Sequence, residues 1–281
     1  MKEKKDQYII AYIADFNETD TVVSYAVHLA QRLNKGLILM HICDADYSKL
    51  STSEAETRLM ELQRQVSLNA GGIAVTYAAL HGKTTSLIEA LPTLLGAVAI
   101  VVRVDRKAPW KSPLSRRSIL KNFANSRAAF LVAQEPLANP ARMQDVAFAV
   151  DFKKESKDKF IWSSYFPRFG GSRMHVLYYD YKDEFLRNKW YANMKQFHKL
   201  YTDLDITFTP HIIESKSTYQ DINALRYAAA EGYGLFIAVT TKEKDGLEFF
   251  IGVQEQRTIV NRERIPILFL NPREDLYVLC D

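Results

Sequence analysis

The chain has 281 residues, about twice the size of a typical domain of ~100–150 residues, so we expect two domains. Its 47% hydrophobic and 25% charged residues, with only 11 Gly and 9 Pro, are typical of a packed globular protein and exclude a disordered or collagen-like chain. The net charge of +4 arises in residues 1–138, which hold 17 Lys and Arg against 13 Asp and Glu, whereas residues 139–281 hold 20 of each.

The sequence indicates a cytoplasmic protein without a membrane span. Its longest apolar run, residues 94–102, is far shorter than the ~20 residues of a membrane-spanning helix. Polar residues beginning at Asp15 follow the first apolar stretch, without the small-residue cleavage site of a signal peptide. Cys43 and Cys280 lie at opposite ends of the chain and form no disulfide framework of the kind that small secreted domains use.

In chain order, the first half begins with a predicted strand and helix. The apolar run over residues 8–14 predicts a strand that ends at Asp15. Apolar residues recur at helical spacing over residues 22–33 and predict a helix that Gly36 stops.

The rest of the first half continues the same alternation. A strand over residues 36–43 is followed by the capping-box pattern Ser53 to Glu56, which predicts the start of a helix that ends at the pair Gly71-Gly72. The remaining predicted elements are a strand up to residue 80, a helix over 87–95, a strand over 99–104, a helix over 119–123 and a strand over 129–134. The strands are continuous apolar runs, which are typical of a parallel sheet with both faces buried.

The second half repeats this order, which predicts a tandem repeat. Asp151 follows a strand as Asp15 does, an offset of 151 − 15 = 136 residues, and the same offset relates Asp180 to Asp44. It also relates strand 235–240 to strand 99–104. The linker 135–141 contains two prolines, so we expect domains at residues 1–138 and 139–281.

With these features the chain resembles the universal stress protein family in its tandem two-domain form. The resemblance rests on a first strand ending in Asp, a second strand of the type Leu-Ile-Leu-Met-His41-Ile, the turn Leu80-His81-Gly82 before a helix, and a closing strand in each half. It implies an α/β fold with two doubly wound parallel five-stranded sheets of strand order 3-2-1-4-5. It also implies dimerisation, so we expect the two repeats to form an intrachain pseudo-dimer through their last strands. Whether whole chains also form homo-oligomers is left open by the sequence.

Members of that family that bind ATP wrap its phosphates in a loop of the form Gly-x2-Gly-x9-Gly-Ser/Thr after the fourth strand. The corresponding segment of the first copy, residues 105–118, contains no glycine, and that of the second copy has Val253 where Ser or Thr is expected. The resemblance places Asp15 and Asp151 on the adenine side of such a site. Because neither copy keeps the loop, we expect no ATP site of the usual kind and no cofactor.

Two local motifs are weak candidates for chemistry. Residues 81–85, His-Gly-Lys-Thr-Thr, resemble the end of a phosphate-binding P-loop, but Tyr77 replaces its first glycine, so a turn with a Thr N-cap is favoured. His41, Cys43, Asp44 and Asp46 are metal-capable, yet neighbouring strand residues point to opposite faces and cannot all reach one ion. We therefore expect no metal site. No nucleophile elbow or catalytic carboxylate pair is identifiable either, so we expect that the protein is not an enzyme.

Basic residues are concentrated at 103–127, a stretch that contains eight Lys and Arg and one acidic residue, Asp105. This stretch starts at the switch point of the predicted sheet, where ligands of doubly wound folds bind. We therefore predict that any small ligand is an anion or nucleotide held by Asp15, Arg103, Arg116, Arg117 and Ser118. The alternative is a solvated charged face; nucleic-acid binding is disfavoured because only Trp110 and Phe123 interleave the cations.

Aromatic residues are concentrated in the second half, and those at 178–201 predict a helix whose broad apolar face serves core packing or an oligomer interface. Taken together, the sequence predicts a non-enzymatic stress-response or regulatory binding module with unidentified protein partners. The alternative is a nucleotide- or phosphate-binding protein, or a weak ATPase, that uses the basic stretch 103–127 of the first copy.

Overall fold

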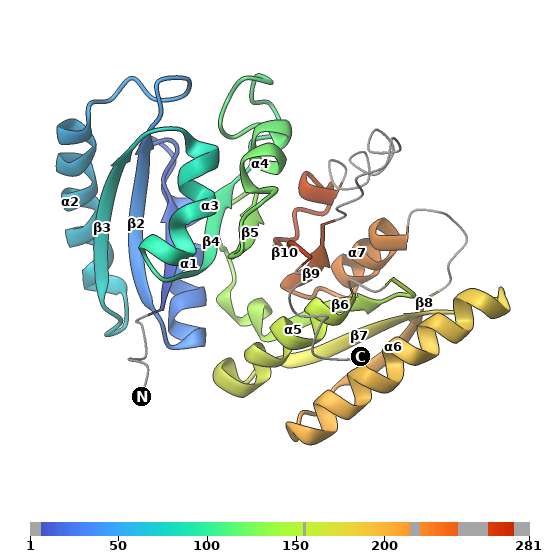
Figure 1. The fold of residues 1–281 in the computed structure, drawn as a ribbon. Coiled ribbons are helices and arrows are strands. Elements are labelled where there is room, and N and C mark those ends of the chain that lie inside the picture. The colour runs from blue at the N-terminus through green and yellow to red at the C-terminus, as the bar shows by residue number, and fades with distance from the viewer. Residues whose placement is uncertain (1–6, 154–155, 214–219, 241–257, 273–281) are drawn as a thin grey trace. The chain divides into compact units, whose positions relative to one another are not determined.

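A computed structural model of the chain describes residues 7–153, 156–213, 220–240 and 258–272. The chain divides into two compact units, residues 1–138 (unit 1) and 139–281 (unit 2). Each unit alternates strands and helices along the chain (Figure 1). Among the described residues no helix is both long and apolar enough to cross a bilayer.

Unit 1 is a five-stranded parallel sheet of order β3-β2-β1-β4-β5. Its elements are β1 (Tyr8–Tyr12), α1 (Asp20–Leu33), β2 (Gly36–Cys43), α2 (Thr52–Asn69), β3 (Val75–His81), α3 (Thr84–Leu94), β4 (Ala97–Arg103), α4 (Arg116–Phe123) and β5 (Ala129–Ala133). The order 3-2-1-4-5 is as predicted. Because crossovers between parallel strands are right-handed, α1 and α2 cover one face and α3 and α4, which contact each other, cover the other.

The core of unit 1 lies along the central strands. Nearly every residue of β1, β2, β4 and β5 is buried, as their continuous apolar runs predict. By contrast β3 is an edge strand, and most of its residues are exposed or half-buried.

Helix α1 ends differently from the prediction. Asn34, not Gly36, is the left-handed cap residue, with φ of 51°, and its backbone N–H bonds to the carbonyls of Ala30 and Gln31. Gly36 is instead the first residue of β2, where the ring of Tyr8 lies so close that a Cβ would be 2.6 Å from its Cε1. Glycine is needed there for close packing rather than for helix termination.

The capping box of α2 also lies two residues earlier than predicted. Ser51 is the N-cap: its Oγ accepts the Glu54 backbone N–H at 3.3 Å, and Glu54 Oε2 accepts the Ser51 N–H at 2.9 Å. The predicted pair Ser53 and Glu56 lies inside the helix, so that assignment was wrong. Both pairs fit the Ser-x-x-Glu pattern, and the sequence alone does not choose between them.

Unit 2 has the same strand order, β8-β7-β6-β9-β10, again all parallel. Its elements are a 3-10 turn (Pro140–Gln144), β6 (Asp145–Val150), α5 (Ser156–Gly170), β7 (Arg173–Tyr179), α6 (Glu184–Asp203), β8 (Thr209–Ile213), α7 (Gln220–Ala230), β9 (Leu235–Val239) and β10 (Ile267–Leu270). The predicted repeat is thus present strand for strand. The segment around Val253, and Cys280, lie outside the described residues.

The aromatic residues of unit 2 divide between core and surface. Phe197 and Tyr201 on α6 are fully buried, with ring centroids 4.3 Å apart. Phe185 and Tyr191 on the same helix are exposed, at 65% and 56%. The helix therefore has one packed aromatic face, and other aromatic rings of the same helix are exposed.

Candidate functional site

Unit 1 has a shallow hollow at its switch point, where the carboxyl ends of β1 and β4 are neighbours. Asp15, Glu18 and Arg103 supply its charges: the first two follow β1, and Arg103 is the last residue of β4. The structure thus brings two of the predicted site residues, Asp15 and Arg103, to one place.

The charges of this hollow are paired within the chain. Arg103, a residue that is only 9% exposed, forms an ion pair through its guanidinium with the carboxylate of Glu18. Asp15 Oδ1 accepts the Asn17 backbone N–H at 2.9 Å and the Asn17 side-chain amide at 3.1 Å. Burial of an unpaired guanidinium is costly, so Glu18 supplies the counter-charge that an anionic ligand would otherwise provide. Sequence reasoning did not single out Glu18.

The other predicted site residues lie at the start of α4 and do not line this hollow. Ser118 is buried, and its backbone N–H bonds to Oγ of Ser115, the N-cap, at 3.2 Å. Arg116 and Arg117 are exposed. The five predicted residues therefore do not form one site: Asp15 and Arg103 belong to the hollow, and Arg116 and Arg117 belong to the surface.

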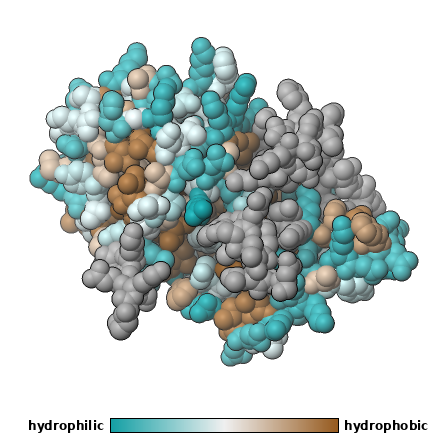
Figure 2. Space-filling model, viewed as in Figure 1, coloured by the Kyte–Doolittle hydropathy of each residue, from teal (hydrophilic) through white to brown (hydrophobic). Residues whose placement is uncertain are grey.

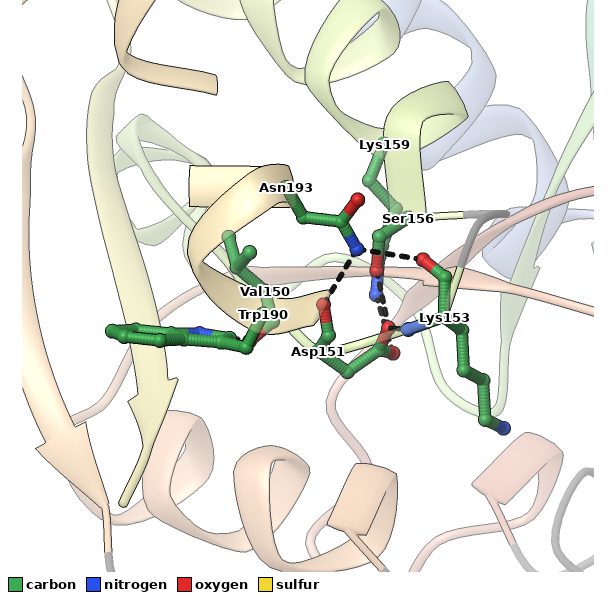
Figure 3. A network of polar contacts seen from close by, with 7 residues as sticks. All are labelled: Val150, Asp151, Lys153, Ser156, Lys159, Trp190 and Asn193. Carbon is green, nitrogen blue, oxygen red and sulfur yellow. Dashed lines mark hydrogen bonds and ion pairs between the residues drawn. The ribbon is translucent and has the colours of Figure 1, made fainter. Parts of the chain in front are cut away.

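Unit 2 contains a buried polar network around Asp151, which directly follows β6 (Figure 3). Asp151 Oδ1 accepts the Lys153 backbone N–H at 2.8 Å and the Ser156 hydroxyl at 2.5 Å. Its Oδ2 lies 3.2 Å from Nζ of Lys159, which is 3% exposed. Ser156 and Lys159 are three residues apart at the start of α5, so one helix face presents both to the strand end.

Helix α6 completes the network through its side-chain donors (Figure 3). Asn193 Nδ2 donates to the backbone carbonyls of Asp151, at 2.9 Å, and of Lys153, at 2.8 Å. Trp190 Nε1 donates to the carbonyl of Val150 at 3.2 Å. The turn after β6 is therefore fixed from both sides, by α5 and by α6.

A small hollow lies beside this network in unit 2, and a second carboxylate, Asp221 at the start of α7, lines it together with Asp151 and Lys159. Burial raises the pKa of Asp221, the negative charge of Asp151 adds to that rise, and Lys159 opposes it. For Asp151, burial favours the neutral form, but Lys159, the Ser156 hydroxyl and Lys153 outweigh it and hold the pKa below its usual range. One buried ammonium thus lies near two carboxylates whose pKa values are shifted in opposite directions.

The hollow bounded by these described residues is small. Asp151, Lys159, Asp221 and Thr240 line a space of about 20 Å³, enough for roughly one water molecule. The family resemblance had indicated Asp151, but Lys159 was not predicted, because a lysine-rich helix start is typical of a solvated surface. The signal that could have found it is the i, i+3 spacing of Ser156 and Lys159 behind Asp151.

The weak motifs of unit 1 have structural roles. Asp44 Oδ2 accepts the Thr84 backbone N–H at 2.7 Å and so caps α3, whereas Thr84 is the first helical residue and not the predicted N-cap. His41 is held between the Ile13 carbonyl, at 2.7 Å, and the Ser48 hydroxyl, at 2.9 Å. Asp46 pairs with Lys83 at 2.6 Å. In the described part of the chain, no group of three His, Cys, Asp or Glu is placed to hold a metal ion.

Comparison with solved structures identifies the fold. A universal stress protein from Archaeoglobus fulgidus DSM 4304 is similar with a TM-score of 0.70 and 13% identity, over 95% of this chain and 97% of that one. A protein from Pseudomonas aeruginosa UCBPP-PA14, assigned to the same family, has a TM-score of 0.66 and 15% identity, over 98% and 96%.

A third similar structure comes from a different context. The cytoplasmic domain of a prokaryotic cation chloride cotransporter has a TM-score of 0.59 and 10% identity, over 98% of this chain and 99% of that one. No protein-family model matches the sequence, and no curated protein matches it either. At these identities the likeness establishes the fold.

Proposed function

We propose that this chain, which has the universal stress protein fold, is a non-enzymatic regulatory binding module of the stress-response type and lacks the usual ATP site in both copies. The fold is that of the similar universal stress proteins from Archaeoglobus and Pseudomonas. The observation that carries the proposal is that each unit neutralises the charges at its own switch point with an internal ion pair.

In unit 1 a nucleotide phosphate would compete with Glu18 for Arg103, which among the described residues is the cation that lines the hollow. Residues 105–118 offer no glycine whose backbone could wrap the phosphate instead. In unit 2 a phosphate near Lys159 would meet the carboxylates of Asp151 and Asp221. Both arrangements disfavour an anionic ligand at the position where doubly wound folds bind one.

The same contacts support a role without catalysis. Asp151 is held in its ionised form with a lowered pKa, and its oxygens already accept from Lys153, Ser156 and Lys159, so it is a poor general base. The Ser156 hydroxyl donates to this weak base and is therefore not activated as a nucleophile.

Calorimetric titration of the full chain with Mg-ATP tests the proposal. We expect no binding tighter than about 1 mM and no release of phosphate from ATP above the buffer rate. In the variant Glu18→Gln, Arg103 loses its counter-charge, so binding of inorganic phosphate is expected to become tighter than in the wild type. A dissociation constant of about 1 μM or tighter for ATP would contradict the proposal.

A second candidate function is favoured by the surface cations. Seven exposed Lys and Arg of the stretch 103–127 have no carboxylate partner within the described residues: Arg106, Lys107, Lys111, Arg116, Arg117, Lys121 and Arg127. They support phosphate or nucleotide binding on the surface. In that case the variant Arg116→Ala/Arg117→Ala loses thermal stabilisation by phosphate or ATP, whereas Glu18→Gln has no effect.

A further inference from the structure

The loop between β4 and α4 carries an exposed tryptophan surrounded by cations. Trp110 is 65% exposed, and Arg106, Lys107, Lys111, Arg116 and Arg117 near it in the chain are also exposed. We call these six residues the Trp110 surface. Figure 2 shows hydrophilic side chains over α4 and the loop that precedes it. Asp105, the acid of this loop, is already engaged, because its Oδ1 accepts the Lys107 backbone N–H at 2.8 Å.

The Trp110 surface is held in shape by the loop itself. The Trp110 carbonyl accepts the Ser115 hydroxyl at 3.0 Å, and the Asp105 backbone N–H bonds to the carbonyl of Leu114 at 3.0 Å. Pro109 and Pro113 further restrict the backbone. A partner would therefore bind a preformed loop and would not have to order it, which lowers the entropic cost of binding.

Two cations are arranged against the indole ring. Lys111 Nζ lies 5.2 Å from the ring centroid, and Arg117 Cζ lies 5.8 Å from it. The cation–π contacts place two positive groups beside an apolar face that solvent still reaches. Carboxylates and an apolar side chain on one short segment would complement this combination, and Trp and Arg are the residues most enriched at interface hot spots.

Other anionic partners match the surface less well. Single-stranded nucleic acids need a row of stacking platforms, but Phe123, the other aromatic residue of the stretch, is completely buried. Stable binding to a membrane surface needs a wider apolar area, but Leu114, the large aliphatic residue of the loop, is 7% exposed. A single aromatic anchor with cations around it fits a protein segment best.

We infer that the Trp110 surface docks an acidic segment of a protein partner, whose carboxylates pair with Lys111, Arg116 and Arg117 and whose apolar side chain covers the Trp110 ring. This inference deepens the proposed function and rests on it, because it names the chemistry of the partner that a binding module would recognise. Binding is expected to weaken with salt, since its charge pairs are exposed.

Fluorescence anisotropy of a labelled Glu-rich peptide with a central Leu, titrated with the full chain, tests the inference. We expect binding that a matched peptide with Gln in place of Glu does not show. The variants Trp110→Ala and Arg116→Ala/Arg117→Ala are each expected to weaken binding about tenfold or more, as hot-spot residues do. Because all the substituted side chains are exposed, the melting temperatures of these variants should equal that of the wild type.

Unit 2 offers matched controls. Phe185 is 65% exposed, as Trp110 is, and Lys189 Nζ lies 4.3 Å from its ring centroid. The variant Phe185→Ala, and the variant Lys195→Ala/Lys199→Ala on the exposed side of α6, are expected to leave the peptide affinity unchanged.

Three outcomes would overturn the inference: equal binding of the Glu and Gln peptides, wild-type affinity in Trp110→Ala, or tighter binding of oligo(dT) or phosphatidylserine vesicles than of the acidic peptide. Its failure can be told apart from failure of the proposed function. Tight ATP binding would contradict the proposed function whatever the peptide does, whereas absent peptide binding without ATP binding contradicts this inference alone.

Discussion

His28 on α1 is a titratable residue that the fold holds in its neutral form. Burial and then the charge of Arg32 lower its pKa from the ordinary value to about 4. Arg32 Nε donates to His28 Nε2 at 3.1 Å, a contact that requires this nitrogen to be unprotonated. The unfolded chain therefore binds a proton more readily than the folded one between about pH 6.5 and pH 4.

The free energy of unfolding is expected to fall as the pH drops through this window. Neutral His28 contributes its full stabilisation only above the pKa that histidine has in the unfolded chain, and this contribution is lost as the pH falls toward the folded-state pKa. In His28→Gln the amide oxygen can still accept from Arg32 but does not titrate. Urea unfolding at about pH 7.5 and pH 4.5 measures how much the free energy of unfolding decreases between the two pH values. This decrease should be smaller in the variant than in the wild type by roughly 1–2 kcal/mol, a range that allows for partial solvent screening of His28. His81→Gln, at an exposed position, is the control and should behave as the wild type.

Lys159 is the cation on which the Asp151 network depends. Its removal in Lys159→Met leaves Asp151 buried without a counter-charge, and loss of one partner of a buried pair costs about 3–5 kcal/mol. Unfolding followed by tryptophan fluorescence measures this loss. The double variant Asp151→Asn/Lys159→Met should recover much of it; equal stability of the single and double variants would argue against a buried ion pair.

Asp221 is expected to respond in the opposite direction. Its pKa is raised, first by burial and then by Asp151, so its charged form is disfavoured in the folded chain at neutral pH. The variant Asp221→Asn removes this charge and is predicted to be more stable than the wild type near pH 7, with the gain shrinking as the pH falls and Asp221 becomes protonated. Melting temperatures at two pH values provide the measurement.

At the scale of elements, the start of α2 offers a test with a built-in control. Ser51 caps the helix and Ser53 lies exposed within it, although both fit the same sequence pattern. Ser51→Ala is expected to lower the free energy of unfolding by about 1 kcal/mol, while Ser53→Ala changes it little. Equal effects of the two substitutions would mean that the box does not stabilise the helix.

Prediction from sequence succeeded for the elements and was weaker for their ends. Apolar periodicity correctly predicted strands and helices, and the continuous apolar runs correctly indicated parallel sheets. The strand order 3-2-1-4-5 was predicted from the family resemblance and is also correct. The ends depend on contacts between residues far apart in the chain. Asp44 caps α3 at Thr84, 40 residues later, and Tyr8 determines the need for Gly36. Local patterns do not contain such contacts.

For the candidate sites, too, some residues could be predicted from the sequence and others depend on tertiary contacts. Asp15 could be predicted because strand ends of a doubly wound sheet meet at the switch point, and Asp151 was indicated by the family resemblance. Their partners could not: Glu18 lies in an ordinary acidic helix start, and Lys159 lies in a lysine-rich segment, where charged residues are usually solvated. A charged residue needs an internal partner when it is buried, and its burial depends on how the helices pack on the sheet. The local sequence around Glu18 and Lys159 does not contain this information.

At the scale of the whole molecule, the pairing of the two repeats stays a prediction. In the described part of the chain the last strand of each copy, β5 or β10, has an edge that needs covering, and a two-fold relation would align these two strands in opposite directions. Spin labels at Glu135 and Arg262, on exposed residues that follow β5 and precede β10, should then lie within about 20 Å, since paired strands are about 4.8 Å apart. A distance distribution centred far beyond this would exclude the pseudo-dimer.

The internal pairing of Arg103 and of Lys159 also determines how the protein meets other molecules in solution. A compensated charge projects little field, so the exposed cations of residues 106–127 dominate the long-range potential of unit 1. An approaching acidic molecule is consequently steered toward that loop before any contact forms. Added salt should therefore slow the encounter itself far more than it speeds the departure of a partner already bound.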